Sequence, residues 1–327
     1  MTTTTTTTTV LDPTVLFDPH PLSGAFRYVN LYTDKACPQV LVVALARPRK
    51  RNALNARLWK EIGLVFDAIG NNNNKDSLSA IRSVLLIGEG KGFCGGIDVT
   101  DISFFPHTSA VRALRGKQGD NDDKDNNDDV ALVGLKFLPL LRQMQASFTA
   151  LETCPVPVVA AIHGSCIGAG VDLVTAADVR LTTANATFSV REVALGLAAD
   201  VGTLQRLPKI CGNQAWVRSV CLTGRDFDGT TACRQGLAAG DPHADCAAVW
   251  DAGLQLCRTM AQHSPVAVRG TKQSLLYARD HNVTDSLEQV AAYSMLALQS
   301  PQFMHGMQTR LMGQQPVYQD MPPSSRL

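Results

Sequence analysis

One stretch of the sequence, residues 156–207, constrains what this chain can fold into more than any other. An apolar run that opens with prolines predicts a buried strand, and the helix-forming run 173–177 follows soon after it. Between them lie three glycines, Gly164, Gly168 and Gly170. Such a turn lets a ligand approach the backbone closely, and the first N–H groups of a helix have no partner inside it. The turn therefore favours negative charge and predicts an oxyanion hole, a cradle for charge that develops on a carbonyl oxygen.

Three carboxylates follow in the same stretch, Asp172, Glu192 and Asp200, and most of their neighbours are small or apolar. Acidic residues in such company are either exposed between buried neighbours or held in a site that alters their pKa values. A single acid near a helix start is usually a capping or solvated residue. Three acids beside a glycine-rich turn, with few other charges nearby, favour a functional site.

A second glycine-dense turn lies earlier in the chain. The apolar run 83–88 predicts a buried strand that leads directly into the sequence Gly88–Asp98. Alone, this motif would indicate only a loop punctuated by glycines. Its occurrence together with the later turn makes it a candidate part of the same site.

The region before that turn is predicted to hold two strands, a basic loop and a helix. The strands are expected near residues 28–32 and 40–46, and apolar residues at helical spacing predict an amphipathic helix over 55–69. The loop between the second strand and this helix is basic and contains Arg47, Arg49, Lys50 and Arg51.

Several motifs, in order, resemble the crotonase (enoyl-CoA hydratase/isomerase) superfamily: Gly164–Leu173, Phe188–Leu197 and Gly202–Leu207. Within it, Arg191–Val193 together with Ala198–Pro208 is most similar to the delta(3,5)-delta(2,4)-dienoyl-CoA isomerases. The resemblance covers roughly residues 28–312 and implies an α/β fold. In that fold a crotonase-like spiral of β-β-α turns precedes a helical C-terminal region that builds trimers, often paired into hexamers.

The resemblance also implies a role for each candidate residue. The backbone N–H groups of Ile97 and Ala169 would form the oxyanion hole, with alanine standing where the family usually has glycine. Glu192 would act at C2 and Asp200 at C6 of a 3,5-dienoyl-CoA, so that loss of one proton and gain of another yield the 2,4-dienoyl isomer. Asp172 would tune or orient these groups.

Substrate binding is expected to involve both glycine turns and the basic loop. The resemblance implies that Gly95, Gly96 and Gly168 lie against the thioester and that the four basic residues meet the phosphates of coenzyme A. An ordinary solvated loop is an equally good interpretation of each basic residue. Coenzyme A would be part of the substrate, so no separate cofactor is expected, and His163 is interpreted as structural.

Two other functions remain open. A 2-enoyl-CoA hydratase would add water with Asp172 and Glu192, whereas a non-catalytic acyl-CoA-binding subunit would keep the fold without the activity. Intact acids at all three positions favour an enzyme. Assays with a 2-enoyl and a 3,5-dienoyl thioester would separate the two enzymatic hypotheses.

Composition sets the broad class. The 327 residues carry a net charge of +1, and 45% of them are hydrophobic. A chain with so little net charge shows no sign of a basic surface that would bind nucleic acid. No apolar run approaches the length of a membrane span. The nine cysteines lack paired spacing or a Cys/His ligand pattern, so reduced thiols and no metal site are expected.

Four regions are predicted along the chain. The threonine-rich segment 1–25 is expected to be disordered, and the core spans 26–225 with an acidic insertion at about 116–130. That insertion lacks the glycine and glutamate of a calcium loop and is interpreted as disordered. A helical trimerisation region, 226–315, and a flexible tail, 316–327, complete the chain. Helices are expected over 132–152, 213–222, 230–237, 244–263, 266–280 and 285–299.

The last three residues, Ser325, Arg326 and Leu327, resemble the serine-basic-leucine address read by the peroxisomal import receptor. The N-terminal threonine run lacks the arginines of a mitochondrial transit peptide. A peroxisome or a related organelle such as a glycosome is therefore expected, with the mitochondrion as the alternative.

Overall fold

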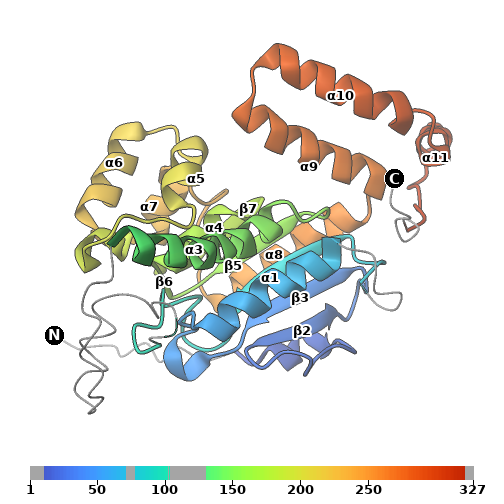
Figure 1. The fold of residues 1–327 in the computed structure, drawn as a ribbon. Helices are drawn as coiled ribbons and strands as arrows, with labels where there is room; N and C mark the ends of the chain where they lie inside the picture. Colours follow the sequence, from blue (N-terminus) through green and yellow to red (C-terminus); the bar gives the residue numbers. More distant parts are fainter. Residues whose placement is uncertain (1–10, 71–77, 102, 104–129, 321–327) are drawn as a thin grey trace.

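The fold is built on a six-stranded sheet in the order β1-β2-β3-β4-β5-β7. A computed structural model describes residues 11–70, 78–101, 103 and 130–320 (Figure 1). The first two strand pairs are antiparallel, and β3, β4, β5 and β7 run parallel. The strands are Phe17–Pro19 (β1), Val29–Asp34 (β2), Val40–Leu45 (β3), Ser83–Gly88 (β4), Val158–Ile162 (β5) and Val179–Thr182 (β7).

Helices cover both faces of this sheet, which explains why its central strands are continuous apolar runs. Every residue of β3, β4 and β5 is buried. In β3, Leu41 and Val43 pack with α1 (Ala56–Gly70) and α3 (Val130–Glu152), and Val42 packs on the other face with α8 (Cys246–Ala261). The sequence predicts β3, β4 and the three helices to within two residues at each bound, whereas the apolar run that predicts β5 begins four residues early, at Cys154.

A second, three-stranded sheet lies beside the first and carries the candidate site. It consists of β6 (Ser165–Ile167), β8 (Thr187–Ser189) and β9 (Phe227–Asp228). Short helices connect and follow these strands: α4 (Ala169–Thr175), the 3-10 helix η5 (Arg191–Leu195), α5 (Thr203–Ile210), α6 (Gln214–Thr223) and α7 (Gly229–Arg234).

The C-terminal part is helical, as expected. Its helices α9 (Pro265–Asp280), α10 (Val283–Ala297) and α11 (Pro301–Leu311) stand to one side of the sheets (orange to red in Figure 1). A serine or asparagine side chain caps the N-terminus of each. The sequence argument does not predict α11. No helix in the described part of the chain is long and apolar enough to cross a membrane.

The expectation that residues 1–25 are disordered is wrong for residues 11–25. This segment forms a 3-10 helix, Pro13–Val15 (η1), and strand β1, which pairs with β2. The reason is Phe17, a fully buried residue whose ring lies 6.1 Å from the rings of both Tyr32 and Trp250. The threonine run, the acidic insertion up to residue 129 and the C-terminal tripeptide lie outside the described residues.

Candidate active site

The structure brings the two glycine-rich turns together, backbone against backbone. Cys94 and Cys166 are partners in an isolated parallel bridge, in which Cys94 N donates to Ser165 O at 2.8 Å and Ile167 N donates to Cys94 O at 3.0 Å. Gly96 adopts a φ of 89°, and a Cβ there would lie 2.8 Å from the carbonyl oxygen of Ile167. Glycine is therefore required where the first turn passes the second.

Each turn presents a backbone N–H group without an acceptor. Leu54 binds the first turn on both sides of Ile97, because Leu54 N donates to Gly96 O and Asp98 N donates to Leu54 O. Ala169 is the first residue of α4, so no helical carbonyl can accept from its N–H. Neither the Ile97 nor the Ala169 N–H group has a hydrogen-bond acceptor among the described residues. These two groups, each next to the contact between Gly96 and Gly168, have the character of an oxyanion hole.

Asp172 and Glu192 form a buried carboxyl pair beside this hole. Asp172 lies in α4 with no solvent exposure, and its Oδ1 accepts from Thr203 N at 2.5 Å. Glu192 lies in η5, and a Cβ on Gly168 would be 3.2 Å from its Oε1. Gly168 has a φ of 53°, so both its backbone conformation and the approach of Glu192 require glycine. Asp172 Oδ2 and Glu192 Oε2 have no hydrogen-bond partner among the described residues.

Burial changes the proton affinity of both members of the pair. It raises the pKa of Asp172 to about 6, although the hydrogen bond from Thr203 N acts in the opposite direction. Burial, followed by repulsion from Asp172, raises the pKa of Glu192 to about 7. Both carboxyl groups therefore bind a proton more readily than exposed acids do, and their titrations are coupled.

Asp200 is the third acid of the site. It follows η5 between two buried residues, Ala199 and Val201, and its own carbonyl accepts from Gln145 Nε2 at 2.7 Å. Burial raises the pKa of its carboxyl group, and its charge adds to the repulsion at both Asp172 and Glu192. The three acids named by the sequence therefore share one electrostatic environment.

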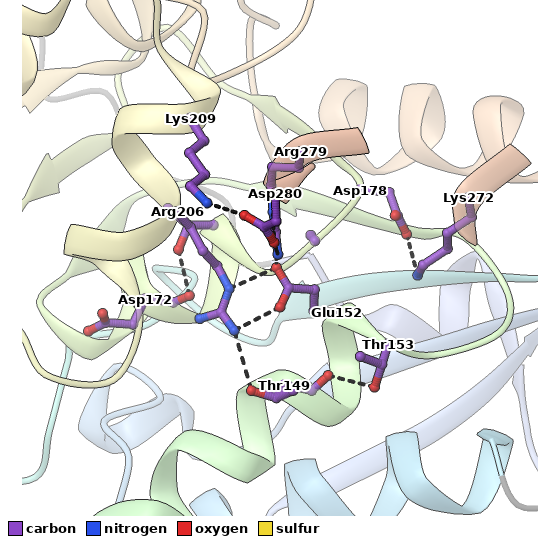
Figure 2. A network of polar contacts seen from close by, with 12 residues as sticks. Thr149, Glu152, Thr153, Asp172, Asp178, Arg206, Lys209, Lys272, Arg279 and Asp280 are labelled. Atoms are coloured by element: carbon purple, nitrogen blue, oxygen red, sulfur yellow. Dashed lines mark hydrogen bonds and ion pairs between the residues drawn. The ribbon is translucent and has the colours of Figure 1, made fainter. Parts of the chain in front are cut away.

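A buried ion-pair network holds the start of α5, which lies next to Asp200. Arg206 donates from Nε and Nη2 to the two carboxylate oxygens of Glu152, at 2.9 and 3.0 Å. Figure 2 shows Glu152 between the guanidinium groups of Arg206 and Arg279, so the network joins α3, α5 and α9. Lys209 and Asp280 form a further ion pair between α5 and α9.

The basic loop contains two kinds of side chain. The guanidinium of Arg47 is committed within the protein: it pairs with Asp98 at 2.9 Å, donates to Ala53 O and lies over the ring of Tyr28. It is therefore not free to meet a phosphate, contrary to the expectation. Arg49, Lys50 and Arg51 are exposed, and the loop is tied to the first glycine turn because Gly95 N donates to Arg51 O at 2.7 Å.

His163 lies outside this site. Its Nε2 is 3.0 Å from Gly90 O, and its ring meets Trp250 edge-on, so it packs between the sheet and α8. Within the described residues, no group of three histidine, cysteine or acidic side chains could hold a metal ion.

Comparison with known proteins places the chain in a family. Residues 140–320 match the family model for enoyl-CoA hydratase/isomerase. The chain belongs to this family. It is 40% identical over 281 residues to the human "Delta(3,5)-Delta(2,4)-dienoyl-CoA isomerase, mitochondrial", a match that covers 86% of this chain and 79% of the relative. It is 32% identical to the peroxisomal isomerase of the same name from Arabidopsis thaliana, over 90% of this chain and 98% of the relative.

Solved structures of the enoyl-CoA hydratase/isomerase family have the same fold. An enoyl-CoA hydratase from Bacillus anthracis superposes with a TM-score of 0.72 at 22% identity, over 89% of this chain and 99% of that one. The predicted crotonase-like α/β fold is therefore confirmed.

The sequence analysis did not predict some of the polar residues around the candidate active site. Gln145 and Arg206 contact the segment that carries Asp200, and Glu152 binds Arg206, but none of the three belongs to a glycine turn or to the three acids. A signal was present in the helix, because positions 145 and 152 are two turns apart and therefore lie on one face. The sequence could not say which element that face would meet.

Proposed function

We propose that this family member converts 3,5-dienoyl-CoA thioesters into 2,4-dienoyl-CoA thioesters during the oxidation of unsaturated fatty acids. The isomerases of that name from human and Arabidopsis, at 40% and 32% identity, support the proposal. The observation that carries it is Asp200, a third acid that shares the environment of the Asp172–Glu192 pair beside the two unpaired N–H groups.

The first step of the reaction is removal of a proton from C2. Ile97 N–H and Ala169 N–H donate to the thioester oxygen and stabilise the enolate that forms when C2 loses its proton. Removing one such donor typically costs about 3–4 kcal/mol of transition-state stabilisation. Glu192 in its ionised form accepts the C2 proton, and its pKa of about 7 keeps both the ionised and the protonated form populated near neutral pH.

The second step is protonation at C6. Charge from the enolate spreads through both double bonds, and Asp200 in its protonated form donates to C6. Burial raises the pKa of Asp200, which lowers the cost of that protonated form. One proton leaves C2 and one arrives at C6, so the reaction needs no added water and no redox cofactor. Asp172 repels charge on Glu192 and, by accepting from Thr203 N, orients α5 next to Asp200.

Coenzyme A enters as part of the substrate. The exposed residues Arg49, Lys50 and Arg51 bind its phosphates, and Gly95, Gly96 and Gly168 allow the thioester to approach the two turns. Arg47 holds this loop in shape through Asp98 and is not itself a phosphate ligand.

The decisive experiment offers the purified protein 3,5-octadienoyl-CoA and follows the ultraviolet absorbance of the 2,4-dienoyl product. The variant Asp200→Asn should lose at least a hundredfold in kcat and keep its affinity for a saturated acyl-CoA. Full activity in this variant would refute the role of Asp200. Turnover of a 2-enoyl thioester alone would favour the hydratase, and binding without turnover of either would favour a non-catalytic subunit.

Self-association through the C-terminal helices is also part of the proposal. A groove of about 940 Å³ lies between α9, α10 and α11, and these helices expose Leu275, Leu287 and Met295. In the crotonase superfamily the equivalent region builds trimers, so the occupant of this surface is another copy of the chain. Light scattering should give the mass of a trimer or a pair of trimers, and a monomer would contradict the assignment.

A peroxisomal location is proposed on the resemblance of Ser325, Arg326 and Leu327 to the address read by the import receptor. Relatives are named as mitochondrial in human and as peroxisomal in Arabidopsis, so the mitochondrion is the alternative. Removing these three residues should leave a fluorescent fusion in the cytosol with its activity intact. Continued import would show that the address lies elsewhere.

A further inference from the structure

The segment that leads to Asp200, residues 193–198, makes little contact with the rest of the protein. Residues 193–198, between Glu192 and the buried Ala199, are all exposed to solvent. Asp200 itself is only half-buried, whereas Val201 and the residues that follow it to Thr203 are buried. The position of the Asp200 carboxyl group therefore depends on the backbone contacts made at residues 200–203.

A polar stripe on α3 makes several of these contacts. Gln145 Nε2 donates to the Asp200 carbonyl at 2.7 Å, and Gln145, Thr149 and Glu152 share one face because they are four and seven residues apart. Thr149 Oγ1 accepts from Arg206 at 3.4 Å, and Glu152 binds the same guanidinium in a bidentate pair (Figure 2). Arg206 Nη1 in turn donates to the carbonyl of Val201 at 3.4 Å. One helix face thus reaches both Asp200 and its neighbour.

The adjacent face of this part of α3 is buried in the core. Met144, Phe148 and Leu151 are buried, and Phe148 stacks on Trp59 of α1 with ring centroids 4.7 Å apart. Trp59 Nε1 donates to the carbonyl of Met144 at 3.0 Å. The polar stripe is therefore carried by a helix that is held in the core, and its bond to the Asp200 carbonyl ties Asp200 to that helix.

We propose that Gln145 is a positioning residue that sets the distance of the Asp200 carboxyl from the Asp172–Glu192 pair. The inference deepens the proposed function, because it rests on Asp200 as the group that protonates C6. Among the described residues, Asp172 from α4 and Glu192 from η5 interact electrostatically with Asp200, and Arg206 from α5, which contacts the neighbouring Val201 carbonyl, is paired with Glu152 of α3. Without the Gln145 bond, the exposed segment before Asp200 can shift and carry the carboxyl outward.

The test compares Gln145→Met with Gln143→Met. Methionine keeps the length of glutamine without its N–H donors, and Gln143 is an exposed residue of the same helix. Gln145→Met should lower kcat for the 3,5-dienoyl substrate about tenfold, the scale of one hydrogen bond, with less than a twofold change in KM. Gln143→Met should behave as the wild type.

The pH–rate profile separates positioning from general loss of structure. Because burial raises the pKa of Asp200, a segment that admits water should lower that pKa, so the limb assigned to Asp200 should move to lower pH in Gln145→Met. A variant that is merely less stable would lose amplitude without moving the limb. Wild-type kcat and an unmoved limb in Gln145→Met, with an unchanged unfolding midpoint, would overturn the proposal.

A second variant, Gln145→Glu, keeps the shape of the side chain and at neutral pH replaces the amide donor with acceptors. It should lose at least as much kcat as Gln145→Met, and full activity would overturn the proposal independently. If Asp200→Asn retains activity, the role of Asp200 fails first. If Asp200→Asn is inactive and both Gln145 variants match the wild type, only the positioning role fails.

Discussion

Replacing Asp172 with asparagine should stabilise the folded protein at alkaline pH. Burial raises the pKa of this carboxyl from 3.8 to about 6, a shift that corresponds to about 3 kcal/mol of destabilisation when the group is ionised. Asparagine has no charge to bury, and its Oδ1 can still accept from Thr203 N. Its amide can also donate to Glu192, whose Oε2 has no partner among the described residues. We therefore expect a gain of about 2–3 kcal/mol in the free energy of unfolding at pH 8.

The sign of the pH dependence follows from proton binding. Between pH 4 and pH 6 the folded protein binds more protons at Asp172 than the unfolded chain does, so wild-type stability falls as the pH rises through this range. Below pH 4 the aspartic acid is neutral in both states, as asparagine always is. The advantage of Asp172→Asn should therefore be absent near pH 4 and grow up to about pH 7, because ionised Asp172 also opposes the ionisation of Glu192, and it should stay constant at higher pH.

Urea unfolding at pH 4, 6 and 8, followed by tryptophan fluorescence at equal protein concentration, measures this difference. Asp251→Asn is the matched control, because Asp251 lies exposed on α8 and its replacement should give no pH-dependent change. If Asp172→Asn lowers the free energy of unfolding by the same amount at all three pH values, burial does not destabilise the ionised carboxylate. The raised pKa of Asp172 would then be wrong.

The remaining predictions concern the basic loop and the buried ion pair. The triple variant Arg49→Ala/Lys50→Ala/Arg51→Ala should raise KM for the CoA thioester at least fivefold. It should leave KM unchanged for the pantetheine thioester, which lacks the nucleotide. An equal rise in KM for both substrates would exclude a phosphate contact. Arg47→Met should instead lower the unfolding midpoint, measured by calorimetry, with equal effects on both substrates, because Arg47 is committed to Asp98. Glu152→Gln should cost about 3–5 kcal/mol of stability by urea unfolding, since it leaves the buried guanidinium of Arg206 without its carboxylate partner, whereas Arg279 keeps Asp280; a loss below 1 kcal/mol would show that solvent already screens the pair.

Local patterns in the sequence were sufficient for β2, β3, β4 and β5 and for the two turns, but not for β1 or for the short strands β6, β7, β8 and β9. The runs that became β3, β4 and β5 are apolar throughout because both faces of the sheet are covered, and glycines recur where the turns touch. The disorder expected through residue 25 is wrong beyond residue 10 because one aromatic residue, Phe17, is buried by contacts with Tyr32 and Trp250. Trp250 lies more than two hundred residues away in the chain, and no local pattern contains that contact.

In the candidate site, too, the sequence predicts what depends on local pattern and misses what depends on distant contacts. The three acids could be singled out because a charged residue among small apolar neighbours is conspicuous in the sequence. The separate fates of Arg47 and Arg49 could not be predicted, since the two residues differ only in what the fold places beside them. Asp98, the partner of Arg47, is fifty-one residues away. Gln145 is an ordinary polar residue in a helix until α3 is packed against the segment that carries Asp200.

Burial is the physical link between the fold and the choice of reaction. Addition of water to a 2-enoyl thioester needs two carboxyl groups that hold one water molecule between them. In this chain Asp172 directs Oδ1 to the Thr203 N–H group, so one of its two oxygens is already bound within the protein. Proton transfer along a dienoyl chain instead needs one acid near C2, another further along the chain, and no bound water. The proposed function assigns Glu192 to C2 and Asp200 to C6, whereas addition of water assigns no role to a carboxyl group at position 200.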